Sequence, residues 1–270
     1  MEEKRDIPKD CAQGGFIDIF KEGGHDALTQ EHVKRGLYGA IFSRRDVRGQ
    51  FTKELVGEDV IARVLLAAHH APSVGFMQPW NFIVIRSEEL RKAIKESFTR
   101  ANDAACTMFH PDKRGLYANL KLEGIMESPL NICVTCDKTR FGPVVIGRTS
   151  NPAMDEYSVV CAVENLWLAA RSEGLGVGWV SILDNMDLKS ILALPDSVEP
   201  IAYLCIGHVS GFFPNPELEI VGWLKRLELD GLVYTEKWGN GCEQAWPELY
   251  QQIRKGMQRV SSPAPTTEVR

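Results

Sequence analysis

The chain has 270 residues, of which 44% are hydrophobic and 25% are charged, and its formal net charge at pH 7 is −5. This composition is ordinary for a globular enzyme of one large or two small domains, whereas a general nucleic-acid binder needs a basic surface. No apolar run approaches the roughly 18 residues of a membrane span. The seven scattered cysteines indicate reduced thiols, and no signal-peptide core is apparent, so we expect a cytoplasmic protein.

The two ends of the sequence differ from its middle. Residues 1–30 are polar, contain glycine and show no sustained period, which predicts a flexible arm. The final "SSPAPTTEVR" is expected to be disordered for the same reason. Since 31–240 contains no internal repeat and no low-complexity linker, we expect one domain there, followed by a C-terminal extension over 241–270.

The first half of the domain alternates helical and strand patterns. Helices are predicted over 31–45 and 58–71, and in the second the residues Ile61, Val64, Leu65 and Ala68 follow the i, i+3, i+4, i+7 spacing. The β-rich run "WNFIVIR" (80–86) predicts a strand. Ser87, followed by two glutamates, is typical of a residue that caps the start of a helix.

The second half repeats this alternation. Strands are predicted at "LNICVTC" (130–136), "LGVGWVSI" (175–182) and "IAYLCIGHV" (201–209). A long helix over 154–173 should end at Gly174, and Asp184 should cap the next helix. Short strands separated by one or two helices favour an α+β domain with a central sheet.

Two motifs that suggest metal or redox chemistry fail on geometry. Cys133 and Cys136 form a CxxC within a predicted strand, where residues three apart point to opposite faces, so their sulfurs cannot meet. His69 and His70 are adjacent on a helix and point about 100° apart, so they cannot chelate one ion. We therefore expect buried structural cysteines and no metal site.

Motifs for other cofactors and nucleophiles are also absent. "GLGVGW" (174–179) misses the dinucleotide pattern GxGxxG and enters a strand from a helix, the reverse of the Rossmann order. It is better explained as a helix stop followed by close backbone packing. The sequence also lacks GxSxG, HExxH and a P-loop, so a hydrolase triad, a zinc protease site and a nucleotide-triphosphate loop are unsupported.

The run "SRRDVRGQF" (43–51) places Asp46 among Arg44, Arg45 and Arg48, and it allows two interpretations. One is a solvated helix end whose charges pair with each other. The other is a site where guanidinium groups hold an anion, since arginine binds phosphate in bidentate fashion. The turn-rich loop "APSVGFMQPWNF" (71–82) and the strand "GVGWVSI" (176–182) could supply a flat, backbone-lined pocket, and together these features favour flavin mononucleotide.

Three motifs resemble the FMN-dependent nitroreductase superfamily over roughly residues 35–240: in order along the chain, Arg-Arg-x-x-Arg, Pro-Ser-x-x-x-x-Gln-Pro-Trp-x-Phe and Gly-x-Gly-x-x-Trp. Ordinary members usually carry Ser at the position of Asp46 and Asn near Met77. These departures resemble one branch of the superfamily, the aerobic 5,6-dimethylbenzimidazole synthases (BluB). The same branch is indicated by "GFMQPWNF", "KLEGI" (121–125), "ICVTCD" (132–137), "GRTSNPAMD" (147–155) and "GWVSI" (178–182).

This resemblance implies a nitroreductase-like α+β fold, with a mostly antiparallel central sheet flanked by helices. It implies an intertwined homodimer with FMN at the subunit interface. The implied reaction is the fragmentation of reduced FMN by dioxygen to 5,6-dimethylbenzimidazole, the lower ligand of vitamin B12 (cobalamin), and erythrose 4-phosphate. A separate flavin reductase would supply the reduced FMN, and no metal, nucleic acid or membrane is implied.

The resemblance also assigns site residues. The phosphate and ribityl chain of FMN would be bound by Arg44, Arg45 and Arg48, and Arg226 would add a second phosphate contact. Leu224 stands where a basic residue is usual, so Lys225 is a candidate replacement. The remaining flavin-contacting positions implied are Asp46, Val47, Pro72, Ser73, Gly75 and Ser181.

Two of these residues are candidates for the chemistry. Neighbouring guanidinium groups should favour the ionised form of Asp46, which would then accept a proton from the ribityl chain or the ring. The Ser181 hydroxyl has one donor and two acceptor lone pairs, enough to orient a reacting group without adding charge. The segment 100–126 is either a lid over the flavin or a plain amphipathic helix.

Two other functions stay open. An ordinary NAD(P)H-dependent nitro- or flavin reductase would retain FMN and recycle it, but Asp46 and Met77 depart from that pattern. A non-catalytic flavin-binding protein would need the arginines but has no use for Asp46 and Ser181.

Overall fold

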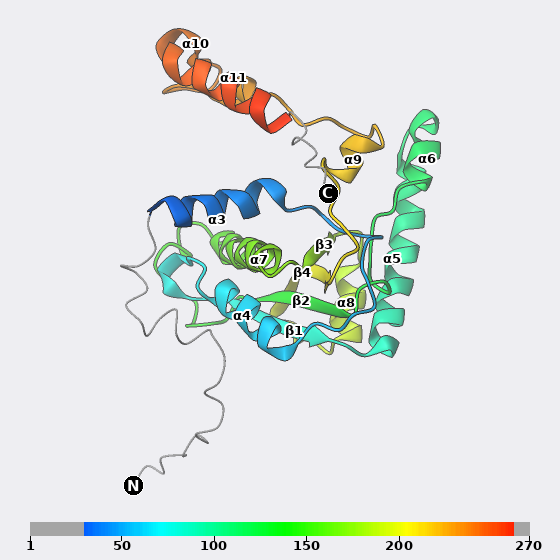
Figure 1. Cartoon of the computed structure of the whole chain (residues 1–270). Helices are drawn as coiled ribbons and strands as arrows, with labels where there is room; N and C mark the ends of the chain where they lie inside the picture. The colour runs from blue at the N-terminus through cyan, green and yellow to red at the C-terminus, as the bar shows by residue number, and fades with distance from the viewer. Residues whose placement is uncertain (1–29, 262–270) are drawn as a thin grey trace.

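A computed structural model describes residues 30–261 of the chain (Figure 1). The expected N-terminal arm therefore lies outside the described residues, apart from Gln30, which begins the first described helix. Of the C-terminal segment expected to be disordered, only Ser261 is described, as the last residue of a helix. Both expectations stay predictions.

The described elements follow the predicted order. The helices are α3 (Gln30–Ser43), α4 (Glu58–His69), α5 (Glu88–Met108), α6 (Pro111–Ala118), α7 (Met154–Ser172), α8 (Asn185–Ile191), α9 (Glu217–Ile220), α10 (Cys242–Ala245) and α11 (Pro247–Ser261). The strands are β1 (Trp80–Ile85), β2 (Leu130–Asp137), β3 (Gly176–Val180) and β4 (Val198–Gly207). Two short 3₁₀ helices are η2 (Val74–Phe76) and η3 (Leu229–Leu232).

The four strands form one sheet in the order β1-β2-β4-β3, and each neighbouring pair is antiparallel. Successive residues of a strand point to opposite faces, so the sheet separates two apolar cores. Helices α4 and α7 cover one face, while α5 and α8 cover the other (Figure 1). This confirms the α+β fold class with an antiparallel central sheet flanked by helices.

The CxxC of β2 illustrates this separation. Cys136 belongs to the core under α4 and α7, whereas Cys133 belongs to the core under α5 and α8. Burial raises the pKa of each thiol to about 12, so both are neutral packing groups. The prediction of buried structural cysteines is confirmed.

The starts of two helices were also predicted correctly. The Ser87 hydroxyl accepts a hydrogen bond from Leu90 N at 3.3 Å at the start of α5. One carboxylate oxygen of Asp184 accepts from Met186 N at 2.7 Å and from Asp187 N at 3.1 Å at the start of α8. Such caps satisfy amide groups that the helix itself leaves unpaired, and each contributes about 0.5–2 kcal/mol.

The C-terminal segment differs from the rest of the molecule. Figure 1 shows α10 and α11 standing away from the sheet, joined to it through α9 and the chain that follows β4. Large apolar side chains on this segment are exposed, among them Leu224, Leu227, Leu232, Trp238 and Trp246. Within the described part of the chain, no helix combines the length and apolarity needed to cross a membrane.

Candidate functional site

The segment carrying Asp46 is fixed to the edge strand of the sheet. After α3, Asp46 forms a parallel bridge with Val177, and Val47 N donates to Val177 O at 2.9 Å. The backbone approaches β3 so closely that a Cβ atom on Gly178 would overlap the Val47 carbonyl oxygen. This confirms close backbone packing within "GLGVGW" at Gly178, and it explains how Asp46 is held in place.

Beside this segment lies a cleft of about 430 Å³, within the ~300–1,000 Å³ usual for small-molecule sites. We call it the arginine cleft. It is lined by Ile41, Phe42, Arg44, Arg45, Asp46, Arg48, Pro216, Glu217, Leu218, Arg226 and Met257. The structure thus brings all four predicted arginines into one cleft, together with Asp46.

Arg45 holds one wall of the arginine cleft together. Its guanidinium donates to four backbone carbonyls, those of Phe42, Arg44, Phe213 and Pro214. Burial lowers the pKa of Arg45, and the positive charges of Arg226 and Arg44 lower it further. Crowded cations of this kind repel one another, so an anion bound between them would be stabilised.

Arg48 is buried but keeps hydrogen-bonding capacity. Its side chain is 9% exposed, its Nη2 donates to Asp46 Oδ2 at 2.5 Å, and its Nη1 lies 3.8 Å from Glu217 Oε2. Of the five N–H donors of an arginine, only the one directed at Asp46 has an acceptor at hydrogen-bond distance among the described residues. The remaining donors are available to a ligand.

Asp46 is bonded on both sides, and the direction of its pKa corrects the expectation from sequence. Its Oδ1 accepts from Trp179 N at 3.1 Å, while its side chain remains 34% exposed. Burial raises the pKa of Asp46, and this outweighs the lowering by Arg48, by the Trp179 amide and by Arg44. The arginines favour the ionised form of Asp46, as expected, but desolvation, which the expectation ignored, sets the net direction of the shift.

The ion-pair interpretation of "SRRDVRGQF" is therefore correct in part. Asp46 does pair with Arg48, but at a buried guanidinium inside a cleft and not at a solvated helix end. Arg44 contacts α7 instead, 4.9 Å from the centre of the Trp167 ring and 3.6 Å from Glu164. Arg44 and Arg48 therefore pair with different carboxylates, Glu164 and Asp46.

The loop 72–78, predicted to approach a flavin, lies elsewhere in this single chain. Pro72 and Ser73 line a separate shallow cleft with Met154, Tyr157 and Ser158. The loop adopts unusual backbone angles, since φ is +58° at Gly75, +54° at Phe76 and +45° at Gln78. Gly75 adopts positive φ without strain, but the non-glycine residues Phe76 and Gln78 cost roughly 1–3 kcal/mol each there and persist only where the surroundings enforce this backbone.

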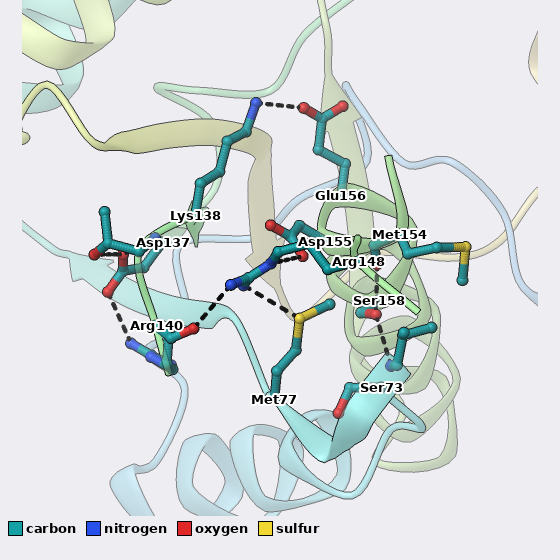
Figure 2. Close-up of polar contacts among 12 residues, drawn as sticks. Ser73, Met77, Asp137, Lys138, Arg140, Arg148, Met154, Asp155, Glu156 and Ser158 are labelled. Carbon is teal, nitrogen blue, oxygen red and sulfur yellow. Dashed lines mark hydrogen bonds and ion pairs between the residues drawn. The ribbon is translucent and has the colours of Figure 1, made fainter. Parts of the chain in front are cut away.

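A buried polar network provides that enforcement (Figure 2). The Arg148 Nε donates to Asp155 Oδ1 at 2.9 Å, and its Nη2 contacts the Met77 sulfur at 3.3 Å. Its Nη1 donates to the carbonyls of Arg140 and Gly142. We call Arg148 with these partners the Arg148 network.

A second contact fastens the same loop to α7. The Ser158 hydroxyl accepts from Val74 N at 3.2 Å and donates to Met154 O at 2.6 Å, as Figure 2 shows. Ser73 accepts from Gln78 N at 3.1 Å within the loop. The loop is therefore preorganised before any ligand contacts it.

The other predicted site residues are dispersed. Ser181 is exposed just beyond β3 and lines a third cleft with Trp179 and Tyr203. Val47 is 2% exposed, so its side chain belongs to the packing behind the site. Lys225 and Leu224 line a neighbouring cleft of about 520 Å³ that shares Arg226 with the arginine cleft.

The segment 100–126 contacts the chain that carries Arg226. Within it, Phe109 and Tyr117 pack against Trp223, with ring centres 5.4 and 6.2 Å away, and Lys113 lies 5.5 Å from the same ring. This segment contains a second helix, α6, which was not predicted as a separate element. Its role as a lid stays a prediction.

Two groups near these clefts were missed by sequence reasoning, Glu217 beside Arg48 and the buried pair Arg148–Asp155. The segment "GRTSNPAMD" was identified as a family motif, but its sequence does not indicate that Arg148 and Asp155 form an ion pair. Glu217 carried no signal at all, because its partner lies 169 residues earlier in the chain.

Comparison with known proteins decides the family. The model of the nitroreductase family matches residues 41–208, which include the sheet and the Asp46 segment. The chain belongs to the nitroreductase family. The 5,6-dimethylbenzimidazole synthase of Rhodospirillum rubrum is 44% identical over 199 residues, covering 74% of this chain and 94% of that protein. A protein of the same name from Rhodobacter capsulatus is 35% identical, covering 77% and 96%.

Solved structures agree on the fold. An iodotyrosine deiodinase bound to FMN and 3-iodo-L-tyrosine matches with a TM-score of 0.59 and 21% identity, over 74% of this chain and 98% of that one. A BluB-like flavoprotein from Clostridium difficile matches with a TM-score of 0.57 and 18% identity, over 74% and 99%. The predicted nitroreductase-like fold is confirmed.

Proposed function

We propose that this protein is a 5,6-dimethylbenzimidazole synthase, which uses dioxygen to fragment reduced FMN into 5,6-dimethylbenzimidazole and erythrose 4-phosphate. The observation that carries the proposal is the position of Asp46, a carboxyl with raised pKa inside a cleft lined by four arginines. The similarity to proteins of this name at 44% and 35% identity supports it. An ordinary reductase is similar at lower identity, 26% for a putative NAD(P)H nitroreductase of Archaeoglobus fulgidus.

The arginine cleft fits the phosphate end of FMN. Its lining carries four guanidinium groups and two carboxylates, an excess of two positive charges, which suits a phosphate dianion. Arg48 and Arg226 would bind the phosphate, while Arg45 holds the wall through backbone carbonyls. Reduced FMN, when bound, supplies both the electrons that activate dioxygen and the atoms of the benzimidazole.

Asp46 would move a proton during the fragmentation. A general acid or base works best when its pKa lies near the working pH, and burial shifts the pKa of Asp46 in that direction. The Trp179 amide and Arg48 hold both of its oxygens, so its orientation is fixed. Ser181 would orient a reacting group through its hydroxyl, which has no hydrogen-bond partner among the described residues.

We further propose that two copies of the chain complete the site. In one chain the arginines and the loop of Pro72, Ser73 and Gly75 belong to separate clefts, so a second copy would have to bring them together. Exposed apolar side chains on α3 and on the C-terminal segment would supply the contact area. These include Val33, Leu37, Tyr38, Phe42, Leu224, Leu227 and Trp246.

The reaction can be tested with three distinguishable outcomes. Protein is mixed with chemically reduced FMN and exposed to air, and the products are separated by chromatography. The proposal expects loss of flavin with formation of 5,6-dimethylbenzimidazole. Flavin recovered intact after reoxidation would favour the ordinary reductase, and flavin that is merely bound would favour a flavin-binding protein.

The assembly has its own test. Light scattering of the purified protein should give the mass of a dimer, with FMN bound to it. A stable monomer that binds FMN with unchanged affinity on dilution would refute the shared site. The supply of reduced FMN by a separate reductase, and a cytoplasmic location, stay predictions.

A further inference from the structure

Glu217 stands out as a carboxylate inside an otherwise anion-binding cleft. It begins the short helix α9 and lines the arginine cleft opposite the Asp46 segment. Its Oε2 is buried and has no hydrogen-bond partner, which is unusual for a native carboxylate. Burying such an oxygen costs stability, so its retention calls for an explanation.

The nearest charged atom to this oxygen belongs to Arg48. Nη1 of Arg48 lies 3.8 Å from Glu217 Oε2, while Nη2 lies 2.5 Å from Asp46 Oδ2. One buried guanidinium is therefore shared between two carboxylates, one from each side. Since each carboxylate weakens the hold of the guanidinium on the other, Glu217 bears directly on the state of Asp46.

We propose that Glu217 is a positioning residue that shares the Arg48 guanidinium with Asp46 and so keeps Asp46 able to carry a proton. Without the Glu217 charge on the other side of Arg48, the guanidinium would favour the ionised form of Asp46 more strongly. The inference rests on the proposed function, because it assigns a purpose to the proton on Asp46.

The charges around Asp46 agree with this role. Burial is the largest cause of the raised pKa of Asp46; among the charges, Arg48 and Arg44 lower this pKa and Glu217 raises it. Arg45 and Arg226 complete the charged lining of the cleft. Glu217 is thus the one acidic side chain of this lining besides Asp46 itself. It also reduces the positive charge that a phosphate would meet.

Replacing Glu217 should therefore have two effects of defined sign. In Glu217→Gln the shape of the side chain is kept and its charge is lost, so Asp46 should become more acidic. The affinity for phosphate should rise by about two- to fivefold, the scale of a single partly exposed charge interaction. A residue that merely held Arg48 in place would give the opposite result, a weaker phosphate site.

Both effects can be measured without any turnover. Carboxyl groups of aspartates labelled with ¹³C are titrated by NMR, and the Asp46 signal is assigned by its loss in Asp46→Asn. Binding of inorganic phosphate, and separately of oxidised FMN, is measured by calorimetry. Since neither measurement uses reduced flavin or dioxygen, failure of this inference is distinguishable from failure of the proposed reaction.

Glu219→Gln is the matched control, because Glu219 lies on the same helix but lines the neighbouring cleft. The inference expects a lower Asp46 titration midpoint and tighter phosphate binding in Glu217→Gln, with Glu219→Gln like the wild type. Glu217→Asp, which keeps the charge but withdraws it, should fall between them. An unchanged or higher midpoint, or weaker phosphate binding, in Glu217→Gln would overturn the inference. If the glutamine variant folds poorly, Glu217→Asp supports or overturns the inference by the same two measurements.

Discussion

Two arginines in this molecule are equally hidden from solvent and yet differ in what they can do. Arg48 in the arginine cleft is 8% exposed, and Arg148 beneath the loop 72–78 is 7% exposed. Arg148 places four of its five N–H donors on protein acceptors, at Asp155, Arg140, Gly142 and Met77. Arg48 places one, on Asp46. Burial therefore does not distinguish a structural arginine from a binding one, whereas the number of donors left over does.

The two regions also differ in charge balance. In the Arg148 network one buried cation meets one buried anion, Asp155, which is itself 3% exposed. The lining of the arginine cleft carries four cations against two carboxylates, and outside the lining Arg44 pairs with Glu164 at 3.6 Å. The network is complete without a ligand, and the cleft is completed by one. Substitutions in the two regions test this distinction.

The largest effect is expected at Asp46. Asp46→Asn keeps the shape and most hydrogen bonds of the side chain but removes the group that moves a proton. The yield of 5,6-dimethylbenzimidazole per reduced FMN consumed should fall by the ~10²–10⁴-fold typical of a lost general acid or base, while FMN still binds. The measurement is made on FMN-saturated wild type and variant, and near-equal yields would return Asp46 to a plain ion-pair role.

The same variant gives a pH test of stability. Because burial raises the pKa of Asp46 in the folded state, the folded protein binds this proton more tightly than the unfolded chain. The contribution of Asp46 to the free energy of unfolding should therefore decrease as the pH rises from its ordinary pKa through its folded pKa. Urea unfolding across this range should show that decrease in the wild type, and it should be missing in Asp46→Asn.

Next in size is the loss of Arg148. Arg148→Met leaves Asp155 buried without its cation and removes the contact to Met77, which costs about 3–5 kcal/mol for a broken buried pair. Denaturant unfolding of the variant measures the loss directly. Arg148→Met combined with Asp155→Asn should recover part of it, because no unpaired charge then remains. A variant as stable as the wild type would show that the network does not hold the loop 72–78.

Arg48→Met is the counterpart of that change in the other region. Its main effect should be on ligand binding, with a loss of about 1.5–3 kcal/mol for one charge-assisted interaction with the FMN phosphate. Its effect on stability should be smaller than that of Arg148→Met, because Asp46 is 34% exposed and can take up a proton. Calorimetric titration with FMN and urea unfolding separate the two quantities. If Arg48→Met and Arg148→Met lose equal stability and Arg48→Met binds FMN as the wild type does, then Arg48 is a structural arginine like Arg148.

Much of the fold was predictable because it depends on local patterns. The spacing of Ile61, Val64, Leu65 and Ala68 predicted α4, and the polar caps Ser87 and Asp184 predicted where two helices begin. Alternation in β2 correctly separated the two cysteines of its CxxC. The helices after residue 216 were not predicted. Helices α9 and α10 are each four residues long, too short for an apolar period to appear, and the 15-residue α11 was missed as well.

The site was predictable only as a set of residues. The motif around Asp46 identified the arginines, but the direction of its pKa was wrong, because a sequence displays neighbouring charges and hides desolvation. Glu217 reaches Arg48 only through the fold of the 168 residues between them. The separation of Pro72 and Ser73 from the arginines within one chain was likewise invisible.

The smallest expected effect is at Ser181. It tests whether unused hydrogen-bonding groups also identify an uncharged functional side chain. Its hydroxyl has no hydrogen-bond partner among the described residues, so by the reasoning applied to Arg48 it is available to a ligand. Ser181→Ala deletes that hydroxyl and no charge, which should leave FMN affinity within error. Product formation should slow by roughly 2–10-fold, the scale of one neutral hydrogen bond of about 0.5–1.5 kcal/mol. Single-turnover rates with reduced FMN at saturating protein measure this, with Ser210→Ala as a control hydroxyl, since Ser210 is already bonded to Gln50 O. If Ser181→Ala reacts at the wild-type rate, Ser181 has no role in the reaction. Unused hydrogen-bonding groups would then identify Arg48 as a ligand-binding residue but would not identify a catalytic hydroxyl.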